Sequence, residues 1–351
     1  MRDDQITKVQ LLPPSEANPR NSEASIIQLK DGRLLLAYSH FYGRDMDAGA
    51  AYIAGRFSED NGRTWTGKDI VLVENEGKFN VMSVSLLRLL SGEIALFYLV
   101  KNSQSDCIPY VRISNDEART WGNRIRVISQ EGYYGLNNDR VIQLPSGRLI
   151  VPVEFSPGAY GPPEAPIVPP CQSMCFLSDD KGISWHRSQT VLEPLIGSKS
   201  GLQEPGVVEL KDSSVMMFMR TDLGGQFVSY SYDRGETWTN PVFSSLKGPC
   251  SPATIKRIPS TGDLLAIWNT PSAICRRPLP RCTLSTAISK DEGKSWQNIK
   301  TLEYDPEASY CYVSLLFVDD KAIMTYAHRH NFFFKGGMLL LTLVDINWFY
   351  E

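Results

Sequence analysis

One eight-residue pattern, present five times along the chain, constrains the fold more than any other feature. The pattern is Ser-x-Asp-x-Gly-x-Ser/Thr-Trp, and alanine replaces the glycine at position 118. A motif that recurs roughly every 53 to 64 residues is the signature of a repeated supersecondary unit. The chain is therefore an array of similar units. The five copies occupy residues 58–65, 114–121, 178–185, 231–238 and 289–296.

The chemistry of this pattern, the Asp box, is that of a turn. An aspartate side chain accepts hydrogen bonds from backbone N–H groups a few residues on, and glycine adopts positive φ without steric cost. The tryptophan offers a large apolar face that anchors the turn to a sheet. The Asp box thus predicts fold rather than activity.

Between the Asp boxes the sequence reads as short strands joined by tight turns. Apolar runs that flank turn residues predict β-hairpins, and helix-length amphipathic stripes are absent. About four strands per roughly 55 residues is typical of a β-propeller blade. The predicted hairpins lie at 25–38, 81–98, 140–152, 206–219 and 313–326.

The repeats predict an all-β fold, a six-bladed β-propeller with Asp-box turns, as a single domain over residues 1–351. Five Asp boxes and a final hairpin without a box give the six blades. We expect the terminal strands, near 5–12 and 338–344, to share one blade and close the ring, because closure removes exposed sheet edges. The proline-rich segment 155–170 is predicted to be a loop over one face.

Composition excludes several classes of function. A formal net charge of -3, without a basic block, gives no electrostatic footprint for nucleic acid. No apolar stretch is long enough to span a bilayer, and the first eight residues lack the apolar segment of a signal peptide. The compartment stays open: cytoplasmic, or secreted or periplasmic if a leader was removed. The seven cysteines lack zinc-site spacing, so we expect no metal and at most one disulfide.

Polar residues at strand ends form a second pattern, outside the Asp boxes. Glu204-Pro205 opens one arm of a hairpin and Arg220 ends the other, so both side chains can face one axis. Arg281 precedes the strand of the last Asp box, and Tyr312 lies in the final hairpin before an acidic turn. Together with the Asp boxes, these segments resemble the sialidase (neuraminidase) superfamily, in particular bacterial-type exo-sialidases. These are six-bladed propellers with a site on the central axis.

The resemblance implies catalytic roles. Tyr312 corresponds to the nucleophile and Glu204 to the base that activates it, with Tyr310 as the alternative nucleophile; valine follows Tyr312 where the family has serine. The family's acid/base aspartate lies on the loop before the first Asp box, which favours Asp47 and leaves Asp45 as the second candidate. That role requires a raised pKa, which we expect from partial burial.

The resemblance also implies three arginines that grip a substrate carboxylate. Arg220 and Arg281 match two of the positions. At the third position this chain has Ser22; the nearest arginine is Arg20, which we take as the third member, and Arg140 is the alternative. Guanidinium groups suit the task because they bind carboxylates bidentately and keep their charge.

The sequence thus predicts a retaining, exo-sialidase-like glycoside hydrolase that needs no cofactor and acts on a glycan with a terminal acidic sugar. A neutral tyrosine nucleophile avoids repulsion by the substrate carboxylate, and sialidases are the tyrosine exception among glycosidases. One alternative is a propeller glycosidase or lyase for another sugar, such as a uronic acid, which the altered region around Arg20 motivates. The other is a glycan-binding propeller without catalysis. The oligomeric state stays open.

Overall fold

β-Strands supply nearly all the regular structure of the chain. The computed structural model describes residues 5–158, 170–273, 275, 281–330 and 336–351, and these contain twenty-five strands and a four-residue 3-10 helix, η2 (Ile346–Phe349). Most of the predicted loop 155–170 lies outside the described residues. None of the described helical structure is long enough to cross a membrane.

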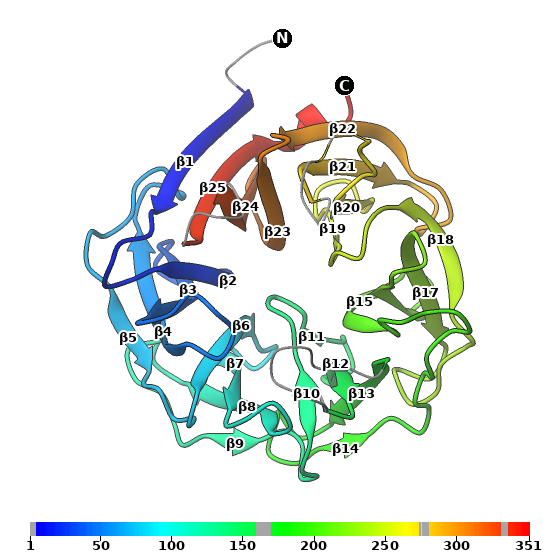
Figure 1. The fold of residues 1–351 in the computed structure, drawn as a ribbon, viewed down its shortest axis with the longest axis horizontal. Helices are drawn as coiled ribbons and strands as arrows, with labels where there is room; N and C mark the ends of the chain where they lie inside the picture. Colours follow the sequence, from blue (N-terminus) through cyan, green and yellow to red (C-terminus); the bar gives the residue numbers. More distant parts are fainter. Residues whose placement is uncertain (1–4, 159–169, 274, 276–280, 331–335) are drawn as a thin grey trace.

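The strands form five antiparallel or mixed sheets that surround a central axis (Figure 1). Four sheets have four strands each. The first contains β2 (Arg20–Gln28), β3 (Leu34–Tyr42), β4 (Ala50–Ser58) and β5 (Ile70–Val73). The second contains β15 (Gln203–Glu209), β16 (Val215–Arg220), β17 (Gly225–Ser231) and β18 (Val242–Lys247). The third contains β19 (Thr254–Arg257), β20 (Leu264–Trp268), β21 (Thr283–Ser289) and β22 (Gln297–Tyr304).

The fourth sheet combines both ends of the chain. It joins β23 (Ala308–Val318), β24 (Lys321–His330) and β25 (Met338–Asp345) to β1 (Ile6–Leu12). β1 pairs antiparallel with β25, with Ile6 opposite Val344. The prediction that the terminal strands share one sheet is therefore confirmed. This pairing also covers the edge of β25 that the ladder would otherwise leave open.

The fifth sheet has nine strands. They are β6 (Asn80–Arg88), β7 (Ile94–Lys101), β8 (Cys107–Ser114), β9 (Ile125–Arg126), β10 (Tyr133–Gly135), β11 (Ile142–Gln143), β12 (Leu149–Ser156), β13 (Gln172–Ser178) and β14 (His186–Arg187). β10 joins the two halves, because it pairs in parallel with β8 and antiparallel with β12. The all-β class is confirmed. The count of six blades stays a prediction, since two expected blades are joined in one sheet.

The Asp boxes are turns built as the sequence predicts. In the first copy the Ser58 hydroxyl donates to Asp60 Oδ1 at 2.9 Å and accepts from Gly62 N at 2.8 Å. Asp60 Oδ1 accepts from Thr64 N at 2.8 Å, and the Trp65 indole donates to the Gly62 carbonyl at 3.0 Å. Corresponding serine and aspartate bonds recur in the other four copies. Side chains thus satisfy backbone groups that the turn leaves without ladder partners.

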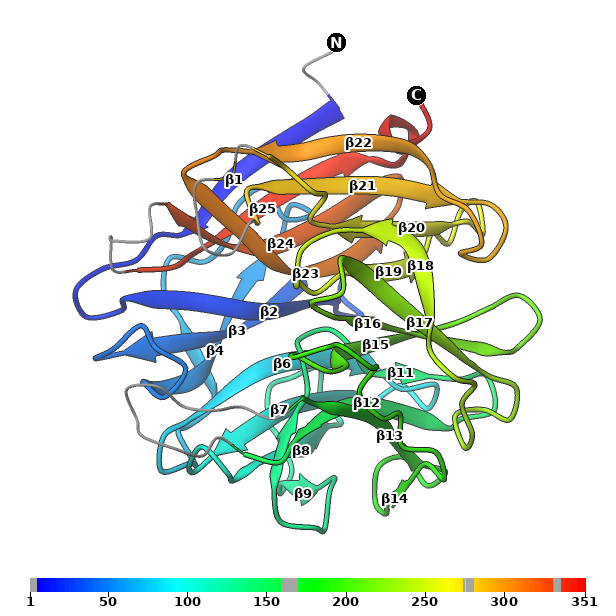
Figure 2. The ribbon, with the colours of Figure 1, turned by 45° about the vertical axis from the view of Figure 1, so that its right-hand side comes forward.

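The core lies between neighbouring sheets. One apolar cluster joins Leu35 of β3 to Val84 of β6 and Leu96 of β7, and similar clusters fill the other junctions. Box tryptophans take part: the Trp185 ring meets Phe97 of β7 edge-on at 6.1 Å. In Figure 2 the sheets lie against one another around the axis, with β2, β6, β15 and β23 toward it. The inner strands therefore position any axial site.

We expect Asp60→Ala to lower the free energy of unfolding by about 1–3 kcal/mol, because backbone and hydroxyl donors lose their acceptor. Urea denaturation followed by tryptophan fluorescence measures the change. The control is Glu59→Ala, which alters the exposed neighbouring residue. Equal midpoints for the two variants would show that the Asp box does not stabilise the fold.

Candidate active site

Four inner strands carry β-bulges that direct side chains into one axial cavity. The pairing register shifts in β2, β6, β15 and β23, and each shift contains a non-glycine residue with positive φ. These are Glu23 (φ 54°), Ser83 (φ 59°), Glu204 (φ 47°) and Tyr312 (φ 60°). A bulge re-aims a side chain, and strained backbone of this kind clusters at functional sites. All four residues line a cavity of about 200 Å³.

A buried loop, residues 137–140, holds these inner strands together. The Asn138 side-chain amide donates to the backbone carbonyls of Ala24 and Tyr312, at 2.8 and 3.2 Å. Asp139 Oδ2 accepts from Leu315 N at 2.9 Å and from Lys256 Nζ at 2.6 Å. The loop therefore ties β2, β19 and β23 together and fixes the bulge that carries Tyr312.

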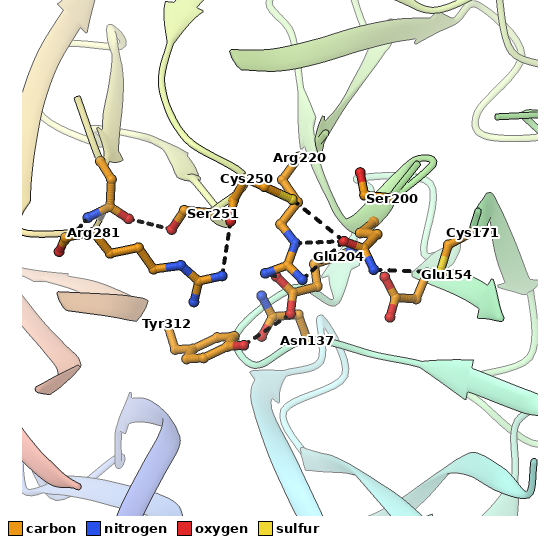
Figure 3. A network of polar contacts seen from close by, with 12 residues as sticks. Asn137, Glu154, Cys171, Ser200, Glu204, Arg220, Cys250, Ser251, Arg281 and Tyr312 are labelled. Carbon is orange, nitrogen blue, oxygen red and sulfur yellow. Dashed lines mark hydrogen bonds and ion pairs between the residues drawn. The ribbon is translucent and has the colours of Figure 1, made fainter. Parts of the chain in front are cut away.

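Tyr312 and Glu204, 108 residues apart in sequence, meet in the cavity (Figure 3). The Tyr312 hydroxyl donates to Glu204 Oε1 at 3.2 Å. Arg220 Nη1 lies 2.8 Å from Glu204 Oε2, and Gln203 Oε1 orients this arginine by accepting from its Nε at 3.2 Å and its Nη2 at 3.1 Å. The structure thus brings three of the predicted site residues together.

Burial raises the pKa of Tyr312 well above its usual value, and the charge of Glu204 raises it further. The phenol therefore keeps its proton at neutral pH and needs a base to become a nucleophile. Glu204 is placed to be that base. Tyr310 is not so placed, because its ring packs in the core, 5.1 Å from that of His328.

Arg281 approaches Tyr312 from the neighbouring sheet. It is 8% exposed, and its guanidinium lies 6.0 Å from the centre of the Tyr312 ring. Arg281 Nη2 donates to the Cys250 carbonyl at 3.0 Å, whereas its buried Nε has no hydrogen-bond partner among the described residues. Because no carboxylate of the described residues lies within ion-pair distance, the buried guanidinium is available to an anionic ligand.

Arg20 and Asp47 form an ion pair at the cavity. Arg20 begins β2, is 5% exposed, and contacts Asp47 Oδ1 through Nη1 at 2.5 Å. Its Nη2 contacts Glu23 Oε1 at 3.0 Å, and its guanidinium lies 4.4 Å from the Phe41 ring centre. Asp47 and Glu23 line the cavity. Asp45 instead contacts Arg20 through its backbone carbonyl, at 3.4 Å.

The expectation that the pKa of Asp47 is raised is wrong. The charge of Arg20 lowers the pKa of Asp47 to about 2, and hydrogen bonding to Arg20 acts in the same direction. The Asp47 side chain is also 67% exposed, so burial is not what dominates. Asp47 is therefore ionised at neutral pH while Arg20 is its partner.

Arg140, the alternative third arginine, lies elsewhere. It lines a different cavity, of about 380 Å³, together with Lys256 and Thr254. Its guanidinium lies 5.4 Å from the Phe218 ring centre, and burial lowers its pKa to about 10. Arg20 rather than Arg140 therefore contacts residues of the axial cavity.

Sequence reasoning missed three charged residues of the cavity: Glu23 on β2, Glu154 on β12 and Lys101 at the end of β7. Glu154 Oε2 accepts from Glu204 N at 2.8 Å, which holds the Glu204 bulge. Burial, followed by the charge of Glu204, raises the pKa of Glu154 to about 7. The sequence signal that could have indicated these residues is a charged residue within or at the end of a strand. That signal is weak, because the pairing register of the strand decides which of its residues face the axis.

In the described part of the chain, no group of three or more histidine, cysteine, aspartate or glutamate residues could hold a metal ion. One disulfide is present, Cys275–Cys282, and the other five cysteines are free thiols.

The chain is similar to known proteins in its repeat family and in its fold. The family model described as a BNR repeat-like domain matches residues 41–323. A Dyadobacter fermentans protein of unknown function superposes with a TM-score of 0.75 at 17% identity, covering 97% of this chain and 99% of that chain. The comparison with curated proteins finds no match.

Two sialidases share the fold at low identity. The Trypanosoma rangeli sialidase has a TM-score of 0.70 at 16% identity, covering 96% of this chain and 59% of its own. The NanB sialidase from Streptococcus pneumoniae has a TM-score of 0.71 at 14% identity, covering 97% and 70% respectively. This chain thus spans less than two thirds of the Trypanosoma protein. The family model thus confirms the predicted family of Asp-box (BNR) repeats, and the two sialidase structures confirm a sialidase-like fold.

We expect the free energy of unfolding to fall as pH rises from about 4.5 to about 7, by up to about 3 kcal/mol from Glu154 alone. The sign follows because the unfolded carboxyl loses its proton at lower pH than the buried one. Glu154→Gln should remove this component and raise the relative stability above pH 7. Urea denaturation across this range, with the exposed Glu16→Gln as control, measures it. An unchanged pH profile in Glu154→Gln would contradict the prediction.

Proposed function

The chain belongs to the BNR repeat-like domain family, and from that premise we propose that it is a retaining glycoside hydrolase that removes a terminal α-linked sialic acid from glycans. The proposed architecture is a six-bladed propeller, with the nine-stranded sheet counted as two blades. The observation that carries the proposal is the contact of Tyr312 with Glu204, backed by Arg220, in the axial cavity.

The tyrosine–glutamate pair suits a substrate that is itself an anion. A carboxylate nucleophile would be repelled by a carboxylate on the anomeric carbon, whereas a protonated phenol is not. Glu204 lies within hydrogen-bond distance of the phenol and can take its proton as the oxygen attacks. The arrangement therefore supplies a nucleophile that becomes charged only during the reaction.

In the proposed reaction three arginines bind the substrate carboxylate, and we call them the carboxylate clamp: Arg220, Arg281 and Arg20. Arg281 has a free Nε and no carboxylate partner among the described residues, so it offers the first contact for a substrate carboxylate. Arg220 and Arg20 are held by Glu204 and Asp47 until a ligand competes for them. A carboxylate that engages Arg220 weakens its ion pair and leaves Glu204 freer to act as a base.

A substrate carboxylate that replaces Asp47 as the partner of Arg20 also allows Asp47 to act as an acid. Arg20 is the largest cause of the low pKa of Asp47 in the ligand-free chain. When a substrate carboxylate takes the guanidinium of Arg20, that cause weakens and the pKa of Asp47 rises. Asp47 can then donate a proton to the leaving oxygen, a task for which an exposed loop residue at the cavity mouth is suited.

Two displacements complete the reaction. In the first, the Tyr312 oxygen bonds to the anomeric carbon, its proton passes to Glu204, and the leaving oxygen takes a proton from Asp47. In the second, Asp47 removes a proton from water, whose oxygen displaces Tyr312; the phenol recovers its proton from Glu204. Each step inverts the anomeric carbon, so the net outcome is retention.

A different acidic sugar, such as a uronic acid, would use the same carboxylate clamp. The substrate is therefore tested with a panel of 4-methylumbelliferyl glycosides: the α-sialoside, a uronide and neutral sugars. Turnover of the uronide with none of the α-sialoside would replace the proposed substrate. Turnover of neither, with binding of glycans retained, would favour a non-catalytic propeller.

We expect Tyr312→Phe and Glu204→Gln each to lower kcat on the α-sialoside by about 100-fold or more, because the first removes the nucleophile and the second its base. The matched control is Tyr310→Phe, which removes the hydroxyl of the alternative tyrosine and should retain activity near that of the wild type. Circular dichroism confirms folding. Loss of activity in Tyr310→Phe but not in Tyr312→Phe would reverse the assignment.

A further inference from the structure

Lys101 is a buried cation of the cavity for which the proposed reaction has no use. It is the last residue of β7, it is 3% exposed, and it lines the cavity with Tyr312 and Glu204. Its Nζ lies 5.1 Å from the centre of the Tyr133 ring. A buried ammonium is expensive unless it gains a charged or hydrogen-bonding partner.

The sheet register fixes where this cation lies. Lys101 is opposite Cys107 on β8, and Cys107 is opposite Tyr133 on β10, which places the ammonium near the tyrosine ring. On its other side Lys101 is opposite Asn80, whose side chain donates to the backbone carbonyls of Asp47 and Gly49, each at 2.8 Å. Lys101 therefore lies in the wall between Tyr133 and the Asp47 loop.

The other cations of the site are accounted for. Arg20 contacts Asp47 and Glu23, and Arg220 contacts Glu204. Arg281 is assigned to the substrate carboxylate. Within the described residues no carboxylate lies within ion-pair distance of the Lys101 ammonium, and Asp47, which lines the same cavity, interacts with it electrostatically at longer range.

We propose that Lys101 determines substrate specificity by binding a second negatively charged group on the sugar, either a sulfate ester or a second carboxylate. The inference rests on the proposed function and deepens it, since it concerns the same cavity and the same glycoside. An anionic group gains more from a desolvated ammonium than a hydroxyl does, because the attraction is charge–charge in a site with little water. The Tyr133 ring lies 5.1 Å from the Lys101 Nζ, and such a cation–π contact favours an ammonium that remains at the cavity wall.

The test compares substrates that differ only in the second group. One arm uses 4-methylumbelliferyl α-sialosides with a single sulfate ester at each free hydroxyl in turn; the other uses the α-sialoside whose terminal side-chain carbon is oxidised to a carboxylate. The readout is kcat/KM relative to the unmodified α-sialoside, for the wild type, Lys101→Met and Lys101→Arg. Lys68→Met, at an exposed lysine outside the cavity, is the matched control.

We expect the wild type and Lys68→Met to prefer at least one modified glycoside by about tenfold or more, mainly through a lower KM. Lys101→Met should lose that preference, and Lys101→Arg should keep part of it. The arm that shows the preference identifies the group as sulfate or carboxylate. The inference is overturned if the wild type shows no preference for any modified glycoside. It is also overturned if the preference survives in Lys101→Met.

Failure of this inference is distinguishable from failure of the proposed function. If the unmodified α-sialoside is hydrolysed and no modified glycoside is preferred, only the role of Lys101 is wrong. If no α-sialoside, modified or not, is hydrolysed, the proposed reaction itself is wrong. In that case isothermal titration calorimetry still decides whether Lys101 recognises the second anionic group. The ligand is the 2,3-didehydro analogue of the sialic acid, and its binding is measured with and without that group.

Discussion

The bonds from the buried loop 137–140 to the inner strands are the constraint on which the site depends. The Asn138 amide and the Asp139 carboxylate bind backbone groups of β2 and β23 at the axis, and Asp139 also holds Lys256 of β19. Those bonds fix strands that come from distant parts of the sequence. They also satisfy backbone groups that the bulges remove from the ladder. Because the loop holds β23 next to β2 and β19, it helps to set the position of Tyr312 at the axis.

The β-bulges bring the side chains of Glu204 and Tyr312 together in the axial cavity. At Glu204 and Tyr312 the chain accepts left-handed backbone at non-glycine residues, which costs of order 1–3 kcal/mol each. In return the two side chains, from different sheets, lie within hydrogen-bond distance. Ion pairs then set the resting state: Glu204 is held by Arg220, and Asp47 by Arg20. A ligand carboxylate would compete for both guanidinium groups, which is the basis of the proposed preference for an acidic sugar.

The sequence predicted those features that local chemistry determines. The Asp boxes indicated repeated β units, and the hairpin signals located the inner strands. The pairing of the chain ends followed from the need to cover a sheet edge. Glu204, Arg220 and Tyr312 were named because their strand segments resemble those of a known family, and the structure brings the three side chains together. The joining of two expected blades by β10 could not be predicted, since it depends on the single residue pair Tyr133–Cys107.

The features that the sequence did not predict depend on contacts between side chains from strands that are far apart in the sequence. The low pKa of Asp47 comes from Arg20, 27 residues away, and the raised pKa of Glu154 comes from burial next to Glu204. Lys101 ends an apolar strand that by itself indicates only a core position. Each effect is a property of register and bulge geometry, which no local pattern in the sequence specifies.

The central claim is that Tyr312 bonds covalently to the sugar, and trapping that intermediate tests it most directly. A sialic acid with fluorine at positions 2 and 3 has an activated leaving group, and the second fluorine slows hydrolysis of the intermediate by destabilising its oxocarbenium-like transition state. Peptide mapping by mass spectrometry after brief incubation locates the label. We predict one sugar adduct, on Tyr312. An adduct on another residue, or turnover of α-sialosides without any covalent species on Tyr312, would contradict the account.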